Sequence, residues 1–281
     1  MEVSLSIESF PLADSTVGDL QKLLAQLPQV YETIFHKPSW QMTEARGFTV
    51  LAYTDEGKLI GAAAALDLVG MHQYEWTVCV DPEVRRQSIG SALVDGIQYG
   101  LQQRQAEGEL AAGLKDEGTA AFLESLGYVS DFEEIMLGAK RLEHSDLPAD
   151  LKVAPYNGQK EELEALLTGA FDEEVIPVIA YNIEEAGRDV WTMEKQGTML
   201  AAAAIVEEDS AIWVTAFAVH PKEQGKGYGQ AFLKWCRHYA FSKGKQQVLL
   251  DVDTSNNALR VYEKAGFQPL QVVEYWRRSE S

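Results

Sequence analysis

An internal repeat constrains the fold of this 281-residue chain more than any other feature of its sequence. The segment VCVDPEVRRQSIGSAL at residues 78–93 parallels FAVHPKEQGKGYGQAF at residues 217–232, so that Gly90 matches Gly229 at a spacing of 139 residues. A segment of this length is long enough to form one compact domain with its own core. The repeat therefore predicts two copies of one domain in tandem.

The repeat continues at the same spacing on both sides of these segments. The alanine run at residues 62–65 falls on the run at 201–204, and Leu-Gly-Tyr at 126–128 falls on Ala-Gly-Phe at 265–267. We interpret this as a gapless correspondence, because several matches at one spacing are too many for chance. The expected organisation is a first domain at residues 1–138, a polar linker at 139–150 with a break at Pro148, and a second domain at 151–281.

Each copy carries the same series of expected elements. A short strand and an amphipathic helix are followed by strands that end in the alanine run, a strand rich in aromatic and β-branched residues, a glycine loop, a helix and a further strand. In the first copy these include a strand at 3–7, a helix at 16–34, a strand at 74–80, a helix that stops near Gly108, and a weak strand at 108–113; in the second copy they include 151–153, 160–171, 211–219, a helix that stops at Gly244, and a buried strand at 247–252.

Composition excludes several classes of protein. Hydrophobic residues make up 46% of the chain, which is enough apolar surface for a folded core. The two cysteines, Cys79 and Cys236, form no C-x-x-C pair, and the five histidines show no metal-binding spacing, so neither a disulfide framework nor a metal site is expected. A formal charge of −19 predicts no binding to nucleic acid or to anionic membranes, and it would attract a cation such as an amine substrate.

The sequence also carries no signal for export or membrane insertion. The first twenty residues have neither the basic region nor the apolar region of a signal peptide. No segment reaches about 18 consecutive apolar residues, the length of a membrane-spanning helix. We therefore expect a cytoplasmic protein.

The glycine loop of the second copy is suited to binding an anion. A strand ends at Val219, the chain turns through KEQGKGYG at residues 222–229, and a helix follows. Glycines let backbone amides approach a phosphate closely, and the start of a helix adds a partial positive charge. A Walker loop is excluded because Gly229 is followed by Gln-Ala and not by Lys-Ser/Thr, and the glycine spacing excludes a dinucleotide-binding loop.

Two motifs of the second copy occur together in one known family. The loop reads Q-x-x-G-x-G from Gln224 to Gly229, and Y-x-K-x-G-F follows at residues 262–267. In this combination the second copy resembles the GCN5-related N-acetyltransferases (GNATs), and the whole chain resembles tandem proteins of that superfamily. The resemblance implies an α/β (α+β type) fold of two tandem GNAT-like domains, each with a mixed, mostly antiparallel twisted sheet flanked by helices.

The resemblance also implies a site for acetyl-coenzyme A (acetyl-CoA) in the second copy. The amides of the loop would hold the pyrophosphate, the strand before it would pair with the pantetheine arm, and Asn256 stands beside Ser255, the position where the family has asparagine. The implied coenzyme-binding residues are Phe217, Ala218, Val219, Gln224, Gly225, Lys226, Gly227, Tyr228, Gly229, Gln230 and Asn256. Tyr262 takes the role of general acid, because a phenol with a pKa near 10 can protonate a departing thiolate.

The base for the acceptor amine stays open at this stage. The strand at 211–219 has no carboxylate, and a chain of water molecules to bulk solvent would also serve. The candidate carboxylates are Glu173, Glu174, Glu194, Asp251 and Asp253. Acceptor specificity is expected to come from residues 172–181 and from their counterpart at 36–40.

The first copy departs from the pattern at two positions. Ser88 stands where the second copy has Gly227, and Leu123 stands where it has Tyr262. An aliphatic side chain cannot donate a proton, so we expect a degenerate first domain. Arg85 and Arg86 leave phosphate binding there open, and we expect Ser88 to be tolerated if its φ is negative.

The expected function is transfer of an acetyl group from acetyl-CoA to a primary amine, on a small molecule or a peptide, by direct attack in the second domain. Neither cysteine stands at a motif position that would make it a nucleophile. The protein is expected to be a monomer or a homodimer. The alternative is a non-catalytic protein that binds or senses acyl-CoA, and a dimerisation role for the first copy is compatible with either function.

Overall fold

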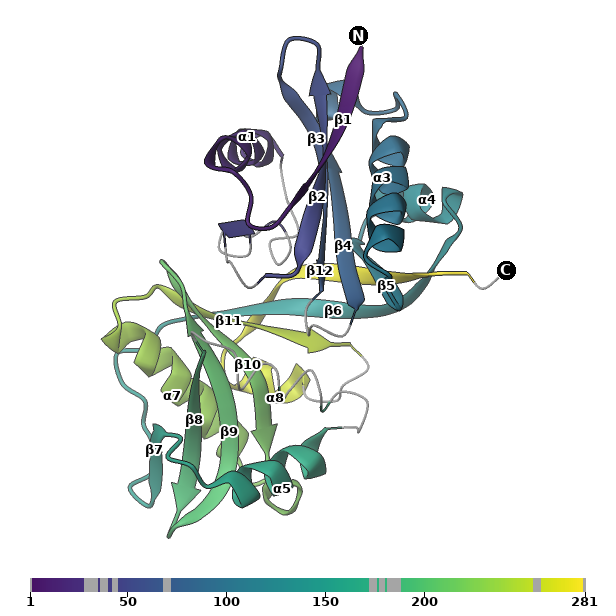
Figure 1. Ribbon diagram of the computed structural model, residues 1–281. Coiled ribbons are helices and arrows are strands. Elements are labelled where there is room, and N and C mark those ends of the chain that lie inside the picture. Colours follow the sequence, from purple (N-terminus) through teal and green to yellow (C-terminus); the bar gives the residue numbers. More distant parts are fainter. Residues whose placement is uncertain are drawn as a thin grey trace. The chain divides into compact units, whose positions relative to one another are not determined.

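The computed structural model describes residues 2–27, 35, 40–41, 45–67, 72–171, 176, 180, 188–254 and 259–279. The chain divides into two compact units, unit 1 with residues 1–133 and 273–281, and unit 2 with residues 134–272. Each unit has a mixed sheet with helices on both faces (Figure 1), which confirms the expected fold class. No helix in the described part of the chain is long and apolar enough to cross a bilayer.

The sheet of unit 1 is antiparallel except for one parallel pair, β4 with β5. Helix α1 covers one face, and helices α3 and α4 lie on the other (Figure 1). The strands in spatial order are β1 (Val3–Ser9), β2 (Gly47–Thr54), β3 (Leu59–Asp67), β4 (Gln73–Val80), β5 (Gly108–Leu114) and β12 (Gln268–Arg278), and the helices are α1 (Asp14–Leu24), α3 (Ile89–Gln103) and α4 (Glu117–Ser125). The weak strand predicted at 108–113 is thus formed, within a buried parallel pair.

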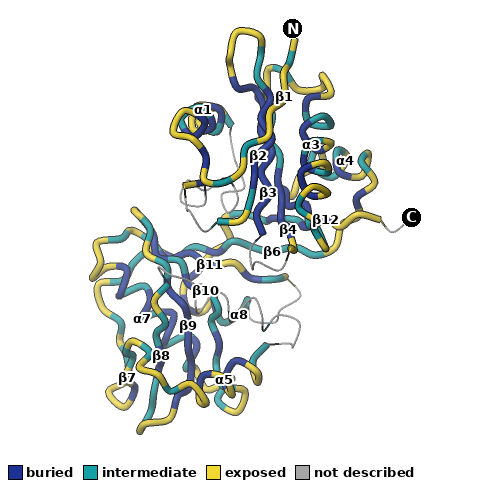
Figure 2. Tube along the Cα trace, viewed as in Figure 1, coloured by how far each residue is buried: buried dark blue, intermediate teal, exposed yellow. Residues whose placement is uncertain are grey.

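Unit 2 repeats this arrangement, again with one parallel pair, β10 with β11. Helix α5 packs on one face of its sheet, and α7 and α8 pack on the other. The strands in spatial order are β6 (Tyr128–Lys140), β11 (Gln247–Asp253), β10 (Ala211–Val219), β9 (Thr198–Glu207), β8 (Arg188–Lys195) and β7 (Leu151–Pro155), and the helices are α5 (Lys160–Ala170), α7 (Tyr228–Ser242) and α8 (Leu259–Lys264). Figure 2 shows the buried inner strands of both sheets.

Two strands pass from one unit into the other along the chain. Tyr128 of β6 belongs to the core of unit 1, whereas Leu137 of the same strand belongs to the core of unit 2. In β12, the residues from Val273 to Trp276 pair with β5 of unit 1. The structure therefore groups residues 134–138 with the second unit and residues 273–281 with the first, in contrast to the boundaries expected from the repeat.

The alanine runs are buried in both units, but their registers differ by one residue from the expected correspondence. Ala63 packs in the core on the α3 side of the unit 1 sheet. Ala202, which lies 139 residues later, packs on the α5 side of the unit 2 sheet, whereas α7 is the helix that corresponds to α3. Because side chains alternate along a strand, a spacing of 140 brings the two strands into agreement. The gapless correspondence was therefore wrong in this part of the repeat.

Two differences between the copies together change the spacing of the repeat before the glycine loop. The connection from β3 to β4 is longer than that from β9 to β10, since Asp67 pairs with Tyr74 and Glu207 pairs with Ile212. In the other direction, β10 contains a bulge between Thr215 and Ala218, whereas β4 pairs with β3 without a shift. The connection is two residues shorter in unit 2 and the bulge adds one residue, so the spacing of 140 in the alanine strands becomes 139 at the loop.

The first prediction concerns Trp276, a residue of β12 that is 2% exposed in the core of unit 1. Trp276→Ala should lower the free energy of unfolding of unit 1 by about 3–5 kcal/mol, because it leaves a large cavity. The exposed neighbour Arg277→Ala should change it by about 0.5 kcal/mol or less. Hydrogen exchange in urea, read on peptides of unit 1, measures both. Equal stability of the two variants would contradict the place of β12 in this core.

Candidate active site in unit 2

The site of unit 2 forms where the parallel strands β10 and β11 stop pairing. They pair only from Ala211 to Trp213 with Gln247 to Leu249, and they diverge beyond that point (Figure 1). Within the described residues, no strand pairs with this edge of β10 further along. Its backbone groups are therefore available to another extended chain.

Three of the expected coenzyme-binding residues lie on this part of β10. Ala218 is buried and pairs with Ala202 of β9. Phe217 points to the other face, where its ring lies 5.8 Å from Phe232 and 6.3 Å from Tyr262. Val219, the last residue of the strand, leads directly into the glycine loop. The sequence thus places the strand, the loop and Tyr262 together in one region of unit 2.

The glycine loop has the backbone conformation of an anion site. Gly225 and Gly227 have φ of 78° and 89°, a left-handed region that glycine adopts without strain. Helix α7 begins at Tyr228, and none of the amides of residues 225–230 has a hydrogen-bond partner among the described residues. A Cβ atom added to Gly225 or Gly227 would meet nothing within 4 Å, so open space lies beside these amides. The loop fits a phosphate group.

Side chains of the loop hold it in place and leave its amides free. Gln224 donates a hydrogen bond from Nε2 to the carbonyl of Val219 at 3.2 Å, and Lys226 forms an ion pair with Glu223 at 3.0 Å. Gly229 is buried, and a Cβ there would lie 3.3 Å from Val261, which explains the need for glycine. Of the other expected residues, Tyr228 and Gln230 are half-buried in the first turn of α7, and Asn256 lies outside the described residues.

Tyr262 on α8 is 8% exposed, in the core shared with α7. Its ring lies 6.4 Å from that of Phe267, and burial raises the pKa of its phenol to about 12. The hydroxyl has no hydrogen-bond partner among the described residues. Tyr262 therefore stays protonated at neutral pH, with a proton that it can donate.

The candidate carboxylates for the base have different surroundings in the structure. Glu194 accepts a hydrogen bond from Gln159 Nε2 at 2.8 Å. Asp251 and Asp253 lie on β11 beyond its last pair with β10. Glu173 and Glu174 lie outside the described residues, as do most of the residues expected to select the acceptor.

Neither cysteine is an activated nucleophile. Burial raises the pKa of the Cys79 thiol to about 12, and it also raises the pKa of the Cys236 thiol. Both thiols are therefore neutral at physiological pH and react poorly. No group of three or more potential metal ligands occurs among the residues that the structure describes.

The glycine loop of unit 1 has the same backbone conformation without the glycines. Arg86 and Ser88 have φ of 62° and 61°, so the condition under which serine was expected to be tolerated, a negative φ, is not met at Ser88. Arg85 donates a hydrogen bond from Nε to the carbonyl of Val80 at 3.1 Å. Gln224 makes the equivalent hydrogen bond to the carbonyl of Val219 in unit 2. Leu123 is 2% exposed in the core and offers no proton. Unit 1 thus retains the loop but lacks the acid.

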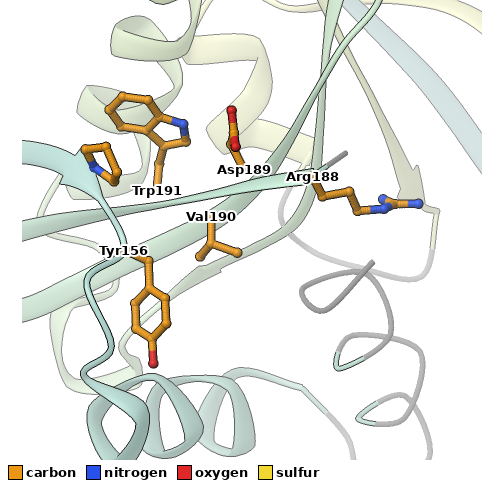
Figure 3. Close-up of a pocket in the computed structure, with 6 residues that line it drawn as sticks. Tyr156, Arg188, Asp189, Val190 and Trp191 are labelled. Atoms are coloured by element: carbon orange, nitrogen blue, oxygen red, sulfur yellow. The ribbon is translucent and has the colours of Figure 1, made fainter. Parts of the chain in front are cut away.

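A pocket of about 290 Å³ lies at the edge strand β7 and its neighbour β8. Figure 3 shows Trp191 and Asp189 on one side of β8 and Val190 on the other. The pocket is lined by Pro155, Tyr156, Arg188, Asp189, Val190 and Trp191. These lining residues include neither Tyr262 nor any of the expected coenzyme-binding residues. We therefore assign the candidate site to β10, the loop and α8.

The second prediction tests the left-handed conformation of Ser88. A residue other than glycine in this region costs about 1–3 kcal/mol, so Ser88→Gly should raise the free energy of unfolding, by about 0.5–1 kcal/mol after the added entropy of the unfolded chain. Ser91→Gly inside helix α3 should lower it by a similar amount. Thermal unfolding measures both variants. A loss of stability in Ser88→Gly would contradict the strained loop.

Comparisons with known proteins agree with both units. The acetyltransferase (GNAT) family model matches residues 156–267, and a second model, the acetyltransferase (GNAT) domain, matches residues 46–130. A mycothiol acetyltransferase of Rhodococcus jostii is 24% identical over 248 residues, which are 79% of this chain and 80% of that protein. The two family models therefore match one region in each unit.

Solved structures share the fold over nearly the full chain. A GCN5-related N-acetyltransferase from Sphaerobacter thermophilus superposes with a TM-score of 0.73 at 16% identity, over 97% of this chain and 95% of that one. A tandem GNAT protein from the clavulanic acid biosynthesis pathway superposes with a TM-score of 0.72 at 14% identity, over 99% and 100%. With a GNAT match in each of its two units, the chain belongs to the GNAT superfamily of acetyltransferases as a tandem member.

Proposed function

We propose that unit 2 transfers an acetyl group from acetyl-CoA to a primary amine. One observation carries this proposal: the free amides of residues 225–230, the unpaired edge of β10 and the buried, protonated Tyr262 lie together in one unit. Membership of the GNAT superfamily supports acyl transfer in general. The fit of the loop to a phosphate supports a coenzyme A thioester as the donor.

Each part of the site has a defined role in the reaction. The loop amides hold the pyrophosphate, and the edge of β10 aligns the pantetheine arm as an added strand. The amine nitrogen attacks the thioester carbon, a C–N bond forms, and the C–S bond breaks. Tyr262 donates its proton to the departing thiolate. Attack is direct, since neither cysteine thiol is ionised at physiological pH.

Unit 1 has a different proposed role. It retains the loop conformation with free amides, while Leu123 replaces the proton donor. This observation favours binding of an acyl-CoA without turnover in unit 1. Catalysis is then confined to unit 2.

Release of free coenzyme A thiol from acetyl-CoA tests the function directly. The purified full chain is assayed with spermidine, glucosamine and a peptide that contains lysine, and products are identified by mass spectrometry. An acetylated amine supports the proposal. If acetyl-CoA binds and no amine is acetylated, the protein is a binding module; if it does not bind, the site assignment is wrong.

The third prediction concerns the loop. Gly227→Val should weaken acetyl-CoA binding at least ten-fold, because a β-branched residue resists φ of 89° and its side chain occupies the space beside the amides. Gly197→Val is the matched control, since Gly197 has φ of 82° and equally open surroundings in the β8–β9 turn. Calorimetry measures affinity. Equal affinity of the two variants would refute the site.

The fourth prediction concerns Tyr262. Tyr262→Phe should lower kcat at least ten-fold with little change in acetyl-CoA affinity, because the hydroxyl acts on the departing thiolate. With a pKa near 12, the phenol should cause no loss of rate between pH 7 and 10. Tyr156→Phe, in the same unit, should leave kcat within about two-fold. Full activity in Tyr262→Phe would make Tyr262 a packing residue and would return unit 1 to consideration as the catalytic unit.

A further inference from the structure

Asp251 occupies a distinct position on β11. It lies two residues beyond Leu249, the last residue of β11 that pairs with β10, and on its other side it pairs with Met136 of β6. Its neighbours Leu250 and Val252 are buried in the core with α7. Because side chains alternate along a strand, the Asp251 carboxylate projects from the opposite face of the sheet, the face that carries α5.

This position places Asp251 and Tyr262 on different sides of the sheet. Tyr262 belongs to the core on the α7 face. The two residues flank the point where β10 and β11 separate, one from each face. A thioester held along the free edge of β10 would lie near this point, with a proton donor on one face of the sheet and a carboxylate on the other.

The same face of unit 1 offers an internal comparison. At the repeat spacing of 139, Ala112 of β5 corresponds to Asp251, and Leu114 corresponds to Asp253. Ala112 is 4% exposed, in an apolar core with Tyr275 and the residues of α1. The position is therefore small, apolar and covered in unit 1, but acidic and exposed in unit 2. The acidic side chain occurs in the unit that also has the tyrosine.

The surroundings of Asp251 favour its neutral form. Burial is the first cause and the charge of Glu134 on β6 is the second, and together they raise the pKa of the Asp251 carboxyl to about 7. The residue as a whole is nonetheless exposed, so a proton that its carboxylate takes up can pass to water. The other carboxylate on this face of β11 is Asp253, and from β10 the corresponding residue is Thr215, which accepts a hydrogen bond from Arg188 at 3.0 Å. A base works best with a pKa near the working pH.

We propose that Asp251 is the base that removes a proton from the ammonium group of the acceptor. The proposal rests on the function proposed for unit 2. The ammonium proton moves to the carboxylate, the nitrogen lone pair forms the C–N bond, the C–S bond breaks, and the thiolate takes a proton from Tyr262. Afterwards Asp251 releases its proton to water and the tyrosinate takes one back. Glu134 acts through Asp251 as a positioning residue, since its charge sets how readily Asp251 holds a proton.

The experiment compares Asp251→Asn with Asp253→Asn, the next residue on the same face. The assay uses whichever of spermidine and glucosamine the parent protein acetylates faster. At pH 7, Asp251→Asn should lower kcat/KM at least 100-fold and leave the acetyl-CoA affinity within two-fold. The loss should shrink above pH 9, where the amine loses its proton to solvent. Asp253→Asn should stay within three-fold of the parent.

The pH profile separates a base from a structural residue. In the parent, kcat/KM should rise with pH through about 7 as Asp251 loses its proton, and this rise should be absent in Asp251→Asn. Glu134→Gln removes a negative charge, so it should shift the rise to lower pH by half a unit or more. A structural role would leave the profile unchanged in Glu134→Gln.

Stability gives a readout that does not depend on turnover. The folded pKa is above the unfolded value, so the contribution of Asp251 to stability falls as pH rises from about 4 to about 7. Asp251→Asn avoids this loss, and its Tm at pH 8 should equal or exceed that of the parent. A lower Tm, or activity within three-fold of the parent at pH 7, overturns the assignment. Failure of the parent to acetylate any amine would instead overturn the proposed function.

Discussion

The early end of hydrogen bonding between β10 and β11 determines what unit 2 can do. Three residues of each strand pair, and the edges beyond them are left without a strand partner in the described part of the chain. An unpaired backbone edge inside a sheet is unfavourable unless something else satisfies it. The bulge in β10, with Ala216 at φ of 49°, bends the strand at this place. The candidate site is thus an interrupted sheet, and the proposed coenzyme would pair with its free edge.

The parallel pair of unit 1 also ends early, at Trp76 and Ala111, so the two units differ in what surrounds this point. In unit 1 the α1 face next to β5 is filled by apolar side chains, and β4 has no bulge. In unit 2 the corresponding position is Asp251, which is exposed. The loops, by contrast, have kept one conformation, although Ser88 must adopt it with an unfavourable φ. The two units thus share the conformation of the glycine loop and differ in the residue at the Ala112 and Asp251 position.

Sequence reasoning was strongest where function depends on neighbours in the chain. The glycine loop and Tyr262 each lie in a short sequence motif, so both could be identified from residues that are adjacent in the chain. The register of the alanine strands could not be predicted, because a shorter connection and a bulge leave a net change of only one residue in the spacing. The alternation of faces in the folded sheet reveals this change. The role proposed for Asp251 was equally hidden, since it depends on Glu134, a residue distant in sequence that pairing brings close. The strand at Gly108–Leu114 has weak propensity and forms through its tertiary contacts.

The place of β12 has a consequence for how the chain is made. Its residues from Val273 to Trp276 complete the sheet of unit 1, yet the ribosome synthesises them after all of unit 2. Until then the edge of β5 has no partner from β12, and the pocket for Trp276 is empty. Unit 1 of the nascent chain therefore has an unpaired strand edge at β5 during the synthesis of unit 2. Unpaired strand edges favour aggregation. The tandem arrangement makes the biosynthetic folding of the first domain depend on completion of the second.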